Sequence, residues 1–330
     1  MARVKKKRKL TFISKFLLLI FFLVGVCFCY QNYDTYKLTQ KKVAEELLLK
    51  EKKEKEKQYN NCLNKKHEET SVTEELLTFQ TELTNMLKQY KVSVYYEDIK
   101  SGYNYKYNED QVIYGASLIK LVDALYLFDN SVDLNKTVLY ESKYIRGSSK
   151  GMDKRNVGEN ISLNDLINYS LSVSDNTAHI MLVDYIGYDT LRDYGKSLGA
   201  SAILTNVGGE KYGNQTAYDT NIYLKKAYEI MTNIKDYPNG YLLKDYMTND
   251  YKNYLIIENE TNIAHKYGSF NDYFHNIGVV FNENPYTISI LTQHGNSNYK
   301  EIINEIHTKI NEMHIKYRGY IEQTCYELVY

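Results

Sequence analysis

The chain has 330 residues, a hydrophobic content of 43% and equal numbers of basic and acidic residues, 41 of each. The balance hides an asymmetry, because residues 1–15 carry seven basic side chains and no acidic one, which leaves the remainder with a formal net charge of −7. A nucleic-acid-binding domain normally has the opposite sign, so we expect no nucleic-acid partner, and the length allows one large domain or two small ones.

An unbroken apolar run, Phe16–Tyr30, follows the basic residues 1–15. It is shorter than the ~20 residues that span a bilayer comfortably, but Lys15 can snorkel and Leu10–Ile13 extend the apolar length. No small-x-small cleavage site follows, which favours an uncleaved signal-anchor over a cleaved signal peptide, and lipidation is a weaker alternative. We therefore expect a cytoplasmic head over 1–15, a transmembrane helix over 16–30 and an extracytoplasmic remainder in the cell membrane.

Residues 31–70 have the composition of a stalk. Lys50–Lys57 carries mixed charges at helical spacing with almost nothing to bury, which is typical of a solvated helix or a flexible spacer. Leu47–Leu49 offer too few apolar positions for sustained heptads, so coiled-coil pairing is the less favoured alternative. The oligomeric state stays open.

A folded domain is predicted over residues 71–330. Ser71-Val72-Thr73-Glu74 matches a capping box, and leucines then recur on one helix face at Leu76, Leu77, Leu83 and Leu87. Strand patterns follow at Val92–Asp98 and Tyr103–Asn108, joined by the turn signal Lys100-Ser101-Gly102.

Helical patterns then dominate the middle of the chain, over 163–173, 175–186, 189–198 and 219–234. Three late strands are predicted at Ile263–Phe270, Phe274–Phe281 and Thr287–His294, before a closing helix over Tyr299–Tyr317. This order predicts an antiparallel sheet interrupted by an all-α lobe, at about residues 121–230.

The cysteines and histidines form no recognisable framework. Cys27 and Cys29 lie in the apolar run, and neither a Cys-x-x-Cys nor a His-Glu-x-x-His occurs, so we expect no metal and no cofactor. A disulfide between Cys62 and Cys325 stays open, because spacing alone does not determine connectivity.

The stretch from Tyr114 to Lys120, Tyr-Gly-Ala-Ser-Leu-Ile-Lys, precedes a long apolar pattern and predicts a helix start near Ser117. Lys120 then lies one turn later on the same face, which places an amine beside a hydroxyl. A buried lysine can act as the base that a serine nucleophile needs, although an N-cap serine and a solvated lysine would give the same short pattern.

Two further motifs follow in the chain. Ser174-Asp175-Asn176 stands where two helical patterns meet and, taken alone, is typical of a helix N-cap. Lys266-Tyr267-Gly268-Ser269 stands in a late strand, where a Lys-x-Gly alone means little.

In this order and context the three motifs resemble those of the penicillin-recognising serine hydrolases, and within them the class A β-lactamase-like family, with Ser-x-x-Lys, Ser-Asp-Asn and Lys-Thr-Gly. The resemblance covers about residues 71–325 and includes Gly158–Leu166, before the second motif. It implies a β-lactamase/transpeptidase-like α/β fold of the α+β type, with a five-stranded antiparallel sheet, a helical lobe and an active site between them.

The resemblance also implies roles for individual residues. Ser117 would be the acylated nucleophile, Lys120 its proton acceptor or part of the relay, and Ser174 the group that passes the proton to the leaving nitrogen. Asn176 would bind the substrate amide, Lys266 the substrate carboxylate, and the backbone N–H groups of Ser117 and Ser269 would form the oxyanion hole. Tyr267, Gly268 and Asn214 complete the expected substrate-binding residues.

Two departures from the family pattern concern the substrate and the turnover. Tyr267 stands where the family has Thr or Ser, whose hydroxyl helps to bind the carboxylate. Glu210, with Asn214 four residues later, matches the pair that holds and activates the deacylating water in hydrolytic members, but the loop after Glu210 is short. Whether Glu210 reaches the acyl group, or is a surface residue, stays open.

These expectations describe a membrane-anchored serine hydrolase that opens a β-lactam amide through an acyl-enzyme at Ser117. A DD-peptidase-like enzyme acting on peptidoglycan stem peptides is the alternative with the same chemistry. A non-catalytic cell-wall-binding module is the alternative from another class, disfavoured because all the motif residues are retained together.

Overall fold

The computed structural model describes residues 12–64, 73–201, 213–249, 253–255, 262–293 and 298–329. The chain divides into two units, one made of residues 1–62 with 325–330, and the other of residues 63–324. Expectations for Ser71 and Glu210 lie outside the described residues.

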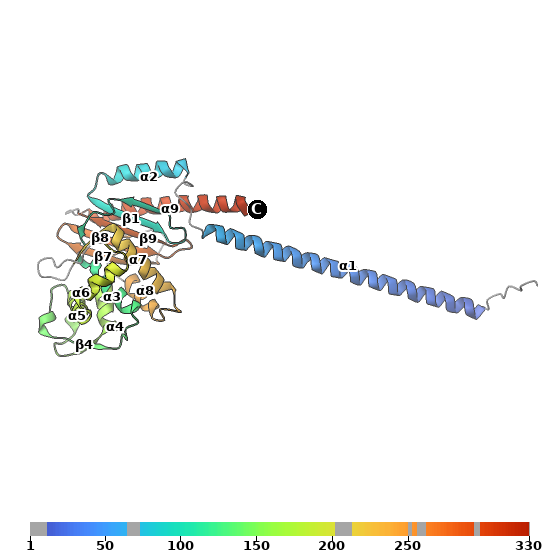
Figure 1. The fold of residues 1–330 in the computed structure, drawn as a ribbon, viewed down its shortest axis with the longest axis horizontal. Helices are drawn as coiled ribbons and strands as arrows, with labels where there is room; N and C mark the ends of the chain where they lie inside the picture. Colours follow the sequence, from blue (N-terminus) through green and yellow to red (C-terminus); the bar gives the residue numbers. More distant parts are fainter. Residues whose placement is uncertain are drawn as a thin grey trace, which may run out of the picture. The chain divides into compact units, whose positions relative to one another are not determined.

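In the first unit, helix α1 (Phe12–Leu63) continues without a break from the apolar run through the charged stretch (Figure 1). Its most apolar 18-residue window has a mean hydropathy of 2.6 and is long enough to cross a membrane, a test that a signal sequence also passes. Exposed pairs four residues apart, Lys41–Glu45 at 3.9 Å and Lys55–Glu51 at 3.7 Å, support the helix in its charged part.

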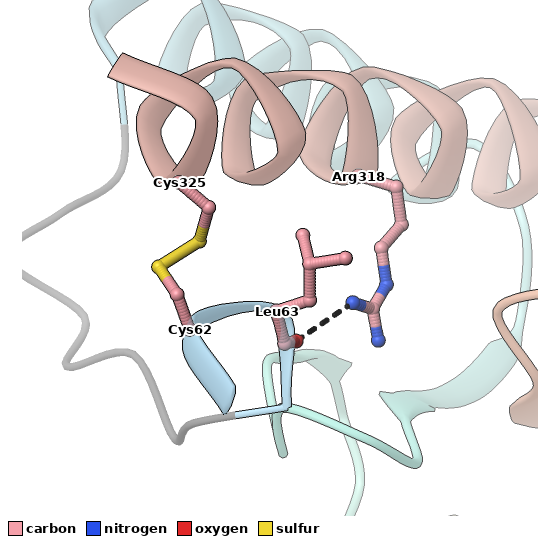
Figure 2. The surroundings of a disulfide bond; sticks show 4 residues. All are labelled: Cys62, Leu63, Arg318 and Cys325. Carbon is pink, nitrogen blue, oxygen red and sulfur yellow. Dashed lines mark hydrogen bonds between the residues drawn. A yellow bond between two sulfur atoms is a disulfide. The ribbon is translucent and has the colours of Figure 1, made fainter. Parts of the chain in front are cut away.

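The first unit also contains a disulfide between Cys62, at the end of α1, and Cys325, on helix α9 (Tyr299–Val329) (Figure 2). The two Cα atoms lie 5.7 Å apart, and the bond joins residues separated by 263 positions. Cys27 and Cys29 are exposed thiols. The pairing that the spacing left open is therefore formed, and a disulfide of this kind is typical of oxidising compartments.

The second unit is built around five antiparallel strands in the order β2-β1-β9-β8-β7. Their bounds are β1 Val92–Asp98, β2 Asn104–Tyr107, β7 Ile263–Phe270, β8 Tyr273–Val280 and β9 Tyr286–Thr292. The predicted five-stranded antiparallel sheet is confirmed, and β1 and β7 have the expected bounds. The two N-terminal strands pair with the three C-terminal ones, so the intervening helices form an insertion.

Strand β1 is buried along its whole length because helices cover both faces of the sheet. On one face, Glu97 accepts a hydrogen bond of 2.8 Å from Asn221 on α7 (Ala217–Thr232). On the other face, the Tyr96 hydroxyl lies 2.7 Å from Nδ1 of His314 on α9. Successive side chains of a strand point to opposite faces, so neighbouring β1 residues serve different helix layers.

The helical lobe packs around α3 (Ile119–Asp129), in which nine of eleven residues are buried. Its other helices are α4 (Leu163–Ser172), α5 (Asn176–Ile186) and α6 (Tyr188–Ser197). A short ladder joins β4 (Thr137–Leu139) to β5 (Asn160–Ser162), and single 3₁₀ turns occur at Ser142–Tyr144 and Met152–Lys154. Because α3 is buried on all sides, it is a rigid support for the residues of its first turn, which include Lys120.

Several expected boundaries differ from the structure. Helix α2 (Glu74–Leu87) is capped by Thr73, whose side chain accepts from the Leu76 N–H, and Leu77 is 52% exposed rather than part of the buried face. Helix α9 extends to Val329, well beyond the expected Tyr317.

Helix α8 (Gly240–Thr248) was not among the expected helices, and the glycine at its start is a residue more typical of a turn. Gly240 has a packing reason instead: a Cβ there would lie 1.8 Å from the Ile230 carbonyl oxygen of α7. The close approach of two helices, which periodicity does not reveal, therefore determines where α8 begins.

Candidate active site

Ser117 lies in a 3₁₀ turn, Ala116–Leu118, that leads directly into α3. The preceding Ala116 has a φ of 46°, in the left-handed region that a residue with a Cβ rarely adopts. The Leu118 N–H donates to the Gly115 carbonyl at 3.0 Å, which closes the turn. Ser117 itself is half-buried, so its hydroxyl stands at the end of a buried helix and within reach of a substrate.

Lys120 lies one turn further along and is completely buried. Its Nζ is 3.1 Å from Ser117 Oγ, 3.2 Å from Ser174 Oγ, 2.7 Å from the Ser174 carbonyl oxygen and 2.7 Å from Asn176 Oδ1. Burial favours the neutral form of an amine, whereas oxygen acceptors favour its charged form. The amine therefore connects the first motif to the second, between two hydroxyl groups.

The second motif forms the sharp connection between α4 and α5. Ser174 has a φ of 54°, and Asp175 rather than Ser174 caps α5, with Oδ1 accepting from the Ala178 N–H at 2.9 Å. The other Asp175 oxygen accepts from the N–H groups of Gly151 and Met152, both at 2.8 Å. Asp175 thus stabilises the turn that directs its two neighbours toward Lys120.

Asn176 is held from both ends of its amide. Its Oδ1 accepts from Lys120, and its Nδ2 donates to the Gly147 carbonyl at 2.9 Å. These two contacts define the orientation of the amide, since its donor and acceptor ends each meet a complementary partner.

The third motif lies on the edge strand β7, beside the nucleophile segment. Lys266 is completely buried with its Nζ 4.3 Å from the centre of the Tyr267 ring, while Ser269 is exposed. A Cβ on Gly268 would lie 2.7 Å from the Gly115 carbonyl oxygen. Only glycine permits this approach, which brings the Lys-x-Gly strand against the residues before Ser117.

Asn214 lies next to the same segment, whereas Glu210 falls outside the described residues. A two-residue ladder pairs β3 (Ile113–Tyr114) with β6 (Asn214–Gln215), with Asn214 opposite Tyr114. The Gly115 N–H donates to the Gly213 carbonyl at 2.9 Å. Residues 213–215 therefore lie beside the nucleophile segment.

A buried carboxylate–imidazole pair joins α3 and α5, one turn further along each helix than Lys120 and Asn176. Asp123 Oδ2 lies 2.5 Å from His179 Nδ1, and both side chains are fully buried. Asp123 follows Lys120 by three residues and His179 follows Asn176 by three, so the pair repeats the Lys120–Asn176 contact along α3 and α5. Sequence analysis overlooked this pair, although the spacing from each motif could have revealed it.

His275, on β8, is a second buried group that sequence analysis overlooked. It stands directly opposite Gly268, and its Nε2 lies 2.8 Å from the Tyr114 carbonyl oxygen. Burial lowers the pKa of His275 to about 4, so the imidazole is neutral at neutral pH. Only the hairpin register places it beside the motif, and sequence alone does not supply that register.

Among the described residues, no group of three or more His, Cys, Asp or Glu side chains could hold a metal ion. The site is instead a set of hydroxyl, amine and amide groups. Such groups suit proton transfer around a serine nucleophile.

The sequence model of the beta-lactamase enzyme family matches residues 78–313 of this chain. The chain belongs to that family. The match includes Ser117, Lys120, Ser174, Asn176 and Lys266, and it ends within α9.

Solved structures with the same fold include both penicillin-binding proteins and β-lactamases. A point mutant of PBP-A, in an acyl-enzyme complex with penicillin G, is 17% identical with a TM-score of 0.65 and covers 73% of this chain and 97% of its own. The TLA-3 extended-spectrum β-lactamase is 20% identical with a TM-score of 0.62, covering 71% and 98%.

A class A β-lactamase from Bacteroides cellulosilyticus DSM 14838 is 18% identical with a TM-score of 0.60, covering 72% of this chain and 97% of its own. Identities this low establish the β-lactamase/transpeptidase fold for the family member described here. They do not distinguish β-lactam hydrolysis from peptide cleavage.

Proposed function

We propose that this β-lactamase family member is a membrane-anchored, extracytoplasmic serine hydrolase that opens the amide of a β-lactam through an acyl-enzyme at Ser117. The position of Lys120 carries the proposal, because its Nζ lies within 3.2 Å of both the Ser117 and Ser174 hydroxyl oxygens. One amine can thus take the proton of the nucleophile and return it toward the leaving group.

In the proposed acylation, Ser117 Oγ attacks the carbonyl carbon as its proton passes to Lys120, or through the relay that Lys120 serves. The backbone N–H groups of Ser117 and Ser269 stabilise the negative charge on the carbonyl oxygen. The carbon–nitrogen bond then breaks, and Ser174 delivers a proton to the nitrogen. Asn176 binds the substrate amide, and Lys266, beside Tyr267 and Gly268, attracts the substrate carboxylate.

In the proposed deacylation, Glu210 and Asn214 hold and activate a water molecule that attacks the ester carbon and releases Ser117. The placement of Asn214 opposite Tyr114 supports this assignment, because it brings the end of the Glu210 segment to the nucleophile. Tyr267 in place of a small hydroxyl residue would alter how the carboxylate is held, and so the choice among substrates.

A DD-peptidase-like activity on peptidoglycan stem peptides is the second candidate. It is favoured by the short connection after Glu210, since Thr216 already caps α7 through the Asp219 N–H at 2.9 Å. A shorter connection leaves less chain to present a catalytic water.

The location rests on two features of the first unit. The apolar part of α1 has the length and composition of a membrane span, and the basic residues before it favour a cytoplasmic N-terminus. The Cys62–Cys325 disulfide supports an oxidising, extracytoplasmic compartment for the remainder.

The full-length protein in detergent, incubated with a fluorescent penicillin, tests the nucleophile. We expect covalent labelling of the wild type and none of Ser117→Ala. Absence of labelling in the wild type, or persistent labelling of the variant, would contradict the assignment of Ser117.

Nitrocefin hydrolysis then separates the two candidate functions. Turnover by the wild type, together with a persistent acyl adduct in Glu210→Gln, would support the β-lactamase mechanism. Labelling without turnover would favour the peptidase, and cleavage of a peptide ending in D-alanyl-D-alanine would then be measured directly.

A further inference from the structure

The imidazole of His275 lies where strands β7, β8 and β9 meet the chain segment that precedes Ser117. Its Nδ1 accepts a hydrogen bond of 3.1 Å from the Thr292 N–H, so Nδ1 carries no hydrogen in this contact. The hydrogen therefore resides on Nε2, which donates to the Tyr114 carbonyl at 2.8 Å. Both ring nitrogens are used, and the side chain is only 1% exposed.

The peptide group between Tyr114 and Gly115 is consequently held on both sides. Its carbonyl accepts from His275, and its N–H donates to the Gly213 carbonyl at 2.9 Å. The next residue, Ala116, has a φ of 46°, a conformation that costs roughly 1–2 kcal/mol for a residue with a Cβ. A peptide group fixed immediately before a strained residue helps to keep that residue, and the N–H of Ser117 after it, in place.

The same imidazole contacts the strand that carries the other oxyanion donor. His275 pairs with Gly268 across the hairpin, and a Cβ on Gly268 would lie 3.2 Å from His275 Cδ2. That Cβ would also lie 2.7 Å from the Gly115 carbonyl oxygen. His275, Gly268 and Gly115 are therefore in close mutual approach, with Ser269 one residue along β7 and Ser117 two residues beyond Gly115.

We propose that His275 is a positioning residue of the oxyanion hole, which sets the separation between the Ser117 and Ser269 N–H groups by tying β8 and β9 to the Tyr114 carbonyl. The proposal rests on the proposed acylation at Ser117. An oxyanion hole depends on donors that are already placed before the charge develops, so a displacement of about 1 Å lowers the rate by up to ~100-fold.

Two substitutions in the full-length protein test this role. His275→Leu removes both hydrogen bonds, and we expect the second-order rate of acylation by a fluorescent penicillin to fall about 10- to 100-fold. His275→Gln keeps one acceptor for Thr292 and one donor for Tyr114, and we expect it to stay within about threefold of the wild type.

His307→Leu is the matched control. His307 is also completely buried, and its Nε2 lies 3.0 Å from the Tyr286 hydroxyl on the α9 side of the sheet. We expect it to lower the melting temperature comparably while leaving the acylation rate of the folded protein within twofold. An equal loss of rate in His307→Leu, or failure of His275→Gln to restore the rate, would overturn the proposal.

Amide hydrogen exchange over residues 113–118 keeps this test separate from the proposed function. We expect faster exchange of the Gly115 and Leu118 amides in His275→Leu, because the Gly115 amide belongs to the peptide group whose carbonyl His275 holds and the Leu118 amide donates to the Gly115 carbonyl. Unchanged exchange there would overturn the proposal, even if the wild type were not labelled by penicillin. Absence of labelling with the expected exchange would instead refute the proposed acylation alone.

Discussion

Lys120 and Arg318 are both buried basic side chains, but they differ in what surrounds them. Arg318, on α9, donates from Nε and Nη2 to the two oxygens of Asp98 on β1, so each charge has an opposite charge as its partner. The described contacts of Lys120 within 3.2 Å include two hydroxyl oxygens, a side-chain amide oxygen and a backbone carbonyl oxygen. The first arrangement keeps both ions in place, whereas the second allows a proton to move between the amine and a hydroxyl.

The two sites also differ in access. Ser117 is half-buried and opens the Lys120 cluster to a substrate, while Asp98, Arg318 and the neighbouring His314 are nearly or fully buried. Arg318 Nη1 additionally donates to the Leu63 carbonyl at 3.3 Å, which ties α9 to the residue after Cys62 (Figure 2). Under the proposed mechanism the Lys120 cluster serves the chemistry, whereas the Asp98–Arg318 pair serves stability.

Replacing Lys120 should have the largest effect on acylation. In Lys120→Met we expect acylation by a fluorescent penicillin to fall about 1,000-fold or more, because the proposed acceptor of the Ser117 proton is removed. The free energy of unfolding should fall by less than about 3 kcal/mol, because the hydrogen bonds lost by Ser174 and Asn176 are partly offset by removal of the desolvation cost of the amine.

Rapid-quench labelling and urea denaturation measure these two effects. Acylation within tenfold of the wild type would remove Lys120 from the proposed mechanism. A loss of stability as large as that expected for Arg318→Met would show that Lys120, like Arg318, mainly stabilises the fold.

Replacing Arg318 should give the opposite result. Arg318→Met leaves the Asp98 carboxylate buried without its cation, which costs about 3–5 kcal/mol in the free energy of unfolding. Acylation by the folded fraction should stay within about twofold. The double variant Asp98→Asn/Arg318→Met is the matched control, and it should recover part of the loss because no unpaired charge remains.

How much of this could be predicted depended on whether a contact follows from helix spacing or from strand register. Ser117 and Lys120 are three residues apart at a helix start, and their contact follows from the sequence once that start is recognised. Asp123 and His179 obey the same spacing from Lys120 and Asn176, so they were within reach of the same argument.

The contacts of His275 were beyond such an argument. They join Gly268 across a hairpin, Thr292 on the next strand and Tyr114, which is 161 residues away. Register decides such contacts, and a shift of one residue would turn the ring to the other face of the sheet. Likewise, helix α8 depends on the approach of Gly240 to α7, which no local pattern contains.

Acidification should destabilise this protein more than it would destabilise a protein without buried histidines. Burial lowers the pKa of His314 and His275 to about 4 and that of His307 to about 3, from an ordinary value of 6.5. Between these values the unfolded chain binds protons that the folded protein does not. Stability is therefore full above pH 6.5 and falls as the pH drops toward 4.

Each histidine contributes at most about 1.4 kcal/mol per pH unit, so we expect a loss of roughly 3 kcal/mol between pH 6.5 and 5.5 for the three together. Urea denaturation at these two pH values measures the loss. The His307→Leu variant should show a shallower dependence by about one third, and an unchanged dependence would contradict the assignment of His307 as a neutral buried group.

The smallest effect on acylation is expected from removal of the Cys62–Cys325 disulfide. Its removal by Cys62→Ser/Cys325→Ser should lower the free energy of unfolding by about 4 kcal/mol and the melting temperature by about 8–16 °C, because the bond joins residues 263 positions apart and the unfolded chain gains conformational freedom. The rate of acylation at Ser117 should not change, since the hydrogen bonds that hold Lys120 and Asn176 run to Ser117, Ser174 and Gly147, which lie on elements other than α9.

Treatment of the wild type with a phosphine reductant should reproduce the double variant, and the same treatment of the variant is the control. A loss of acylation on reduction of both the wild type and the variant would show that the reductant acts elsewhere on the protein. A loss in the reduced wild type that the untreated variant reproduces would show that the Cys62–Cys325 bond controls the site as well as stability. The expected result, lower stability with unchanged acylation, would show that the disulfide, like the Asp98–Arg318 pair, stabilises the protein without controlling the site.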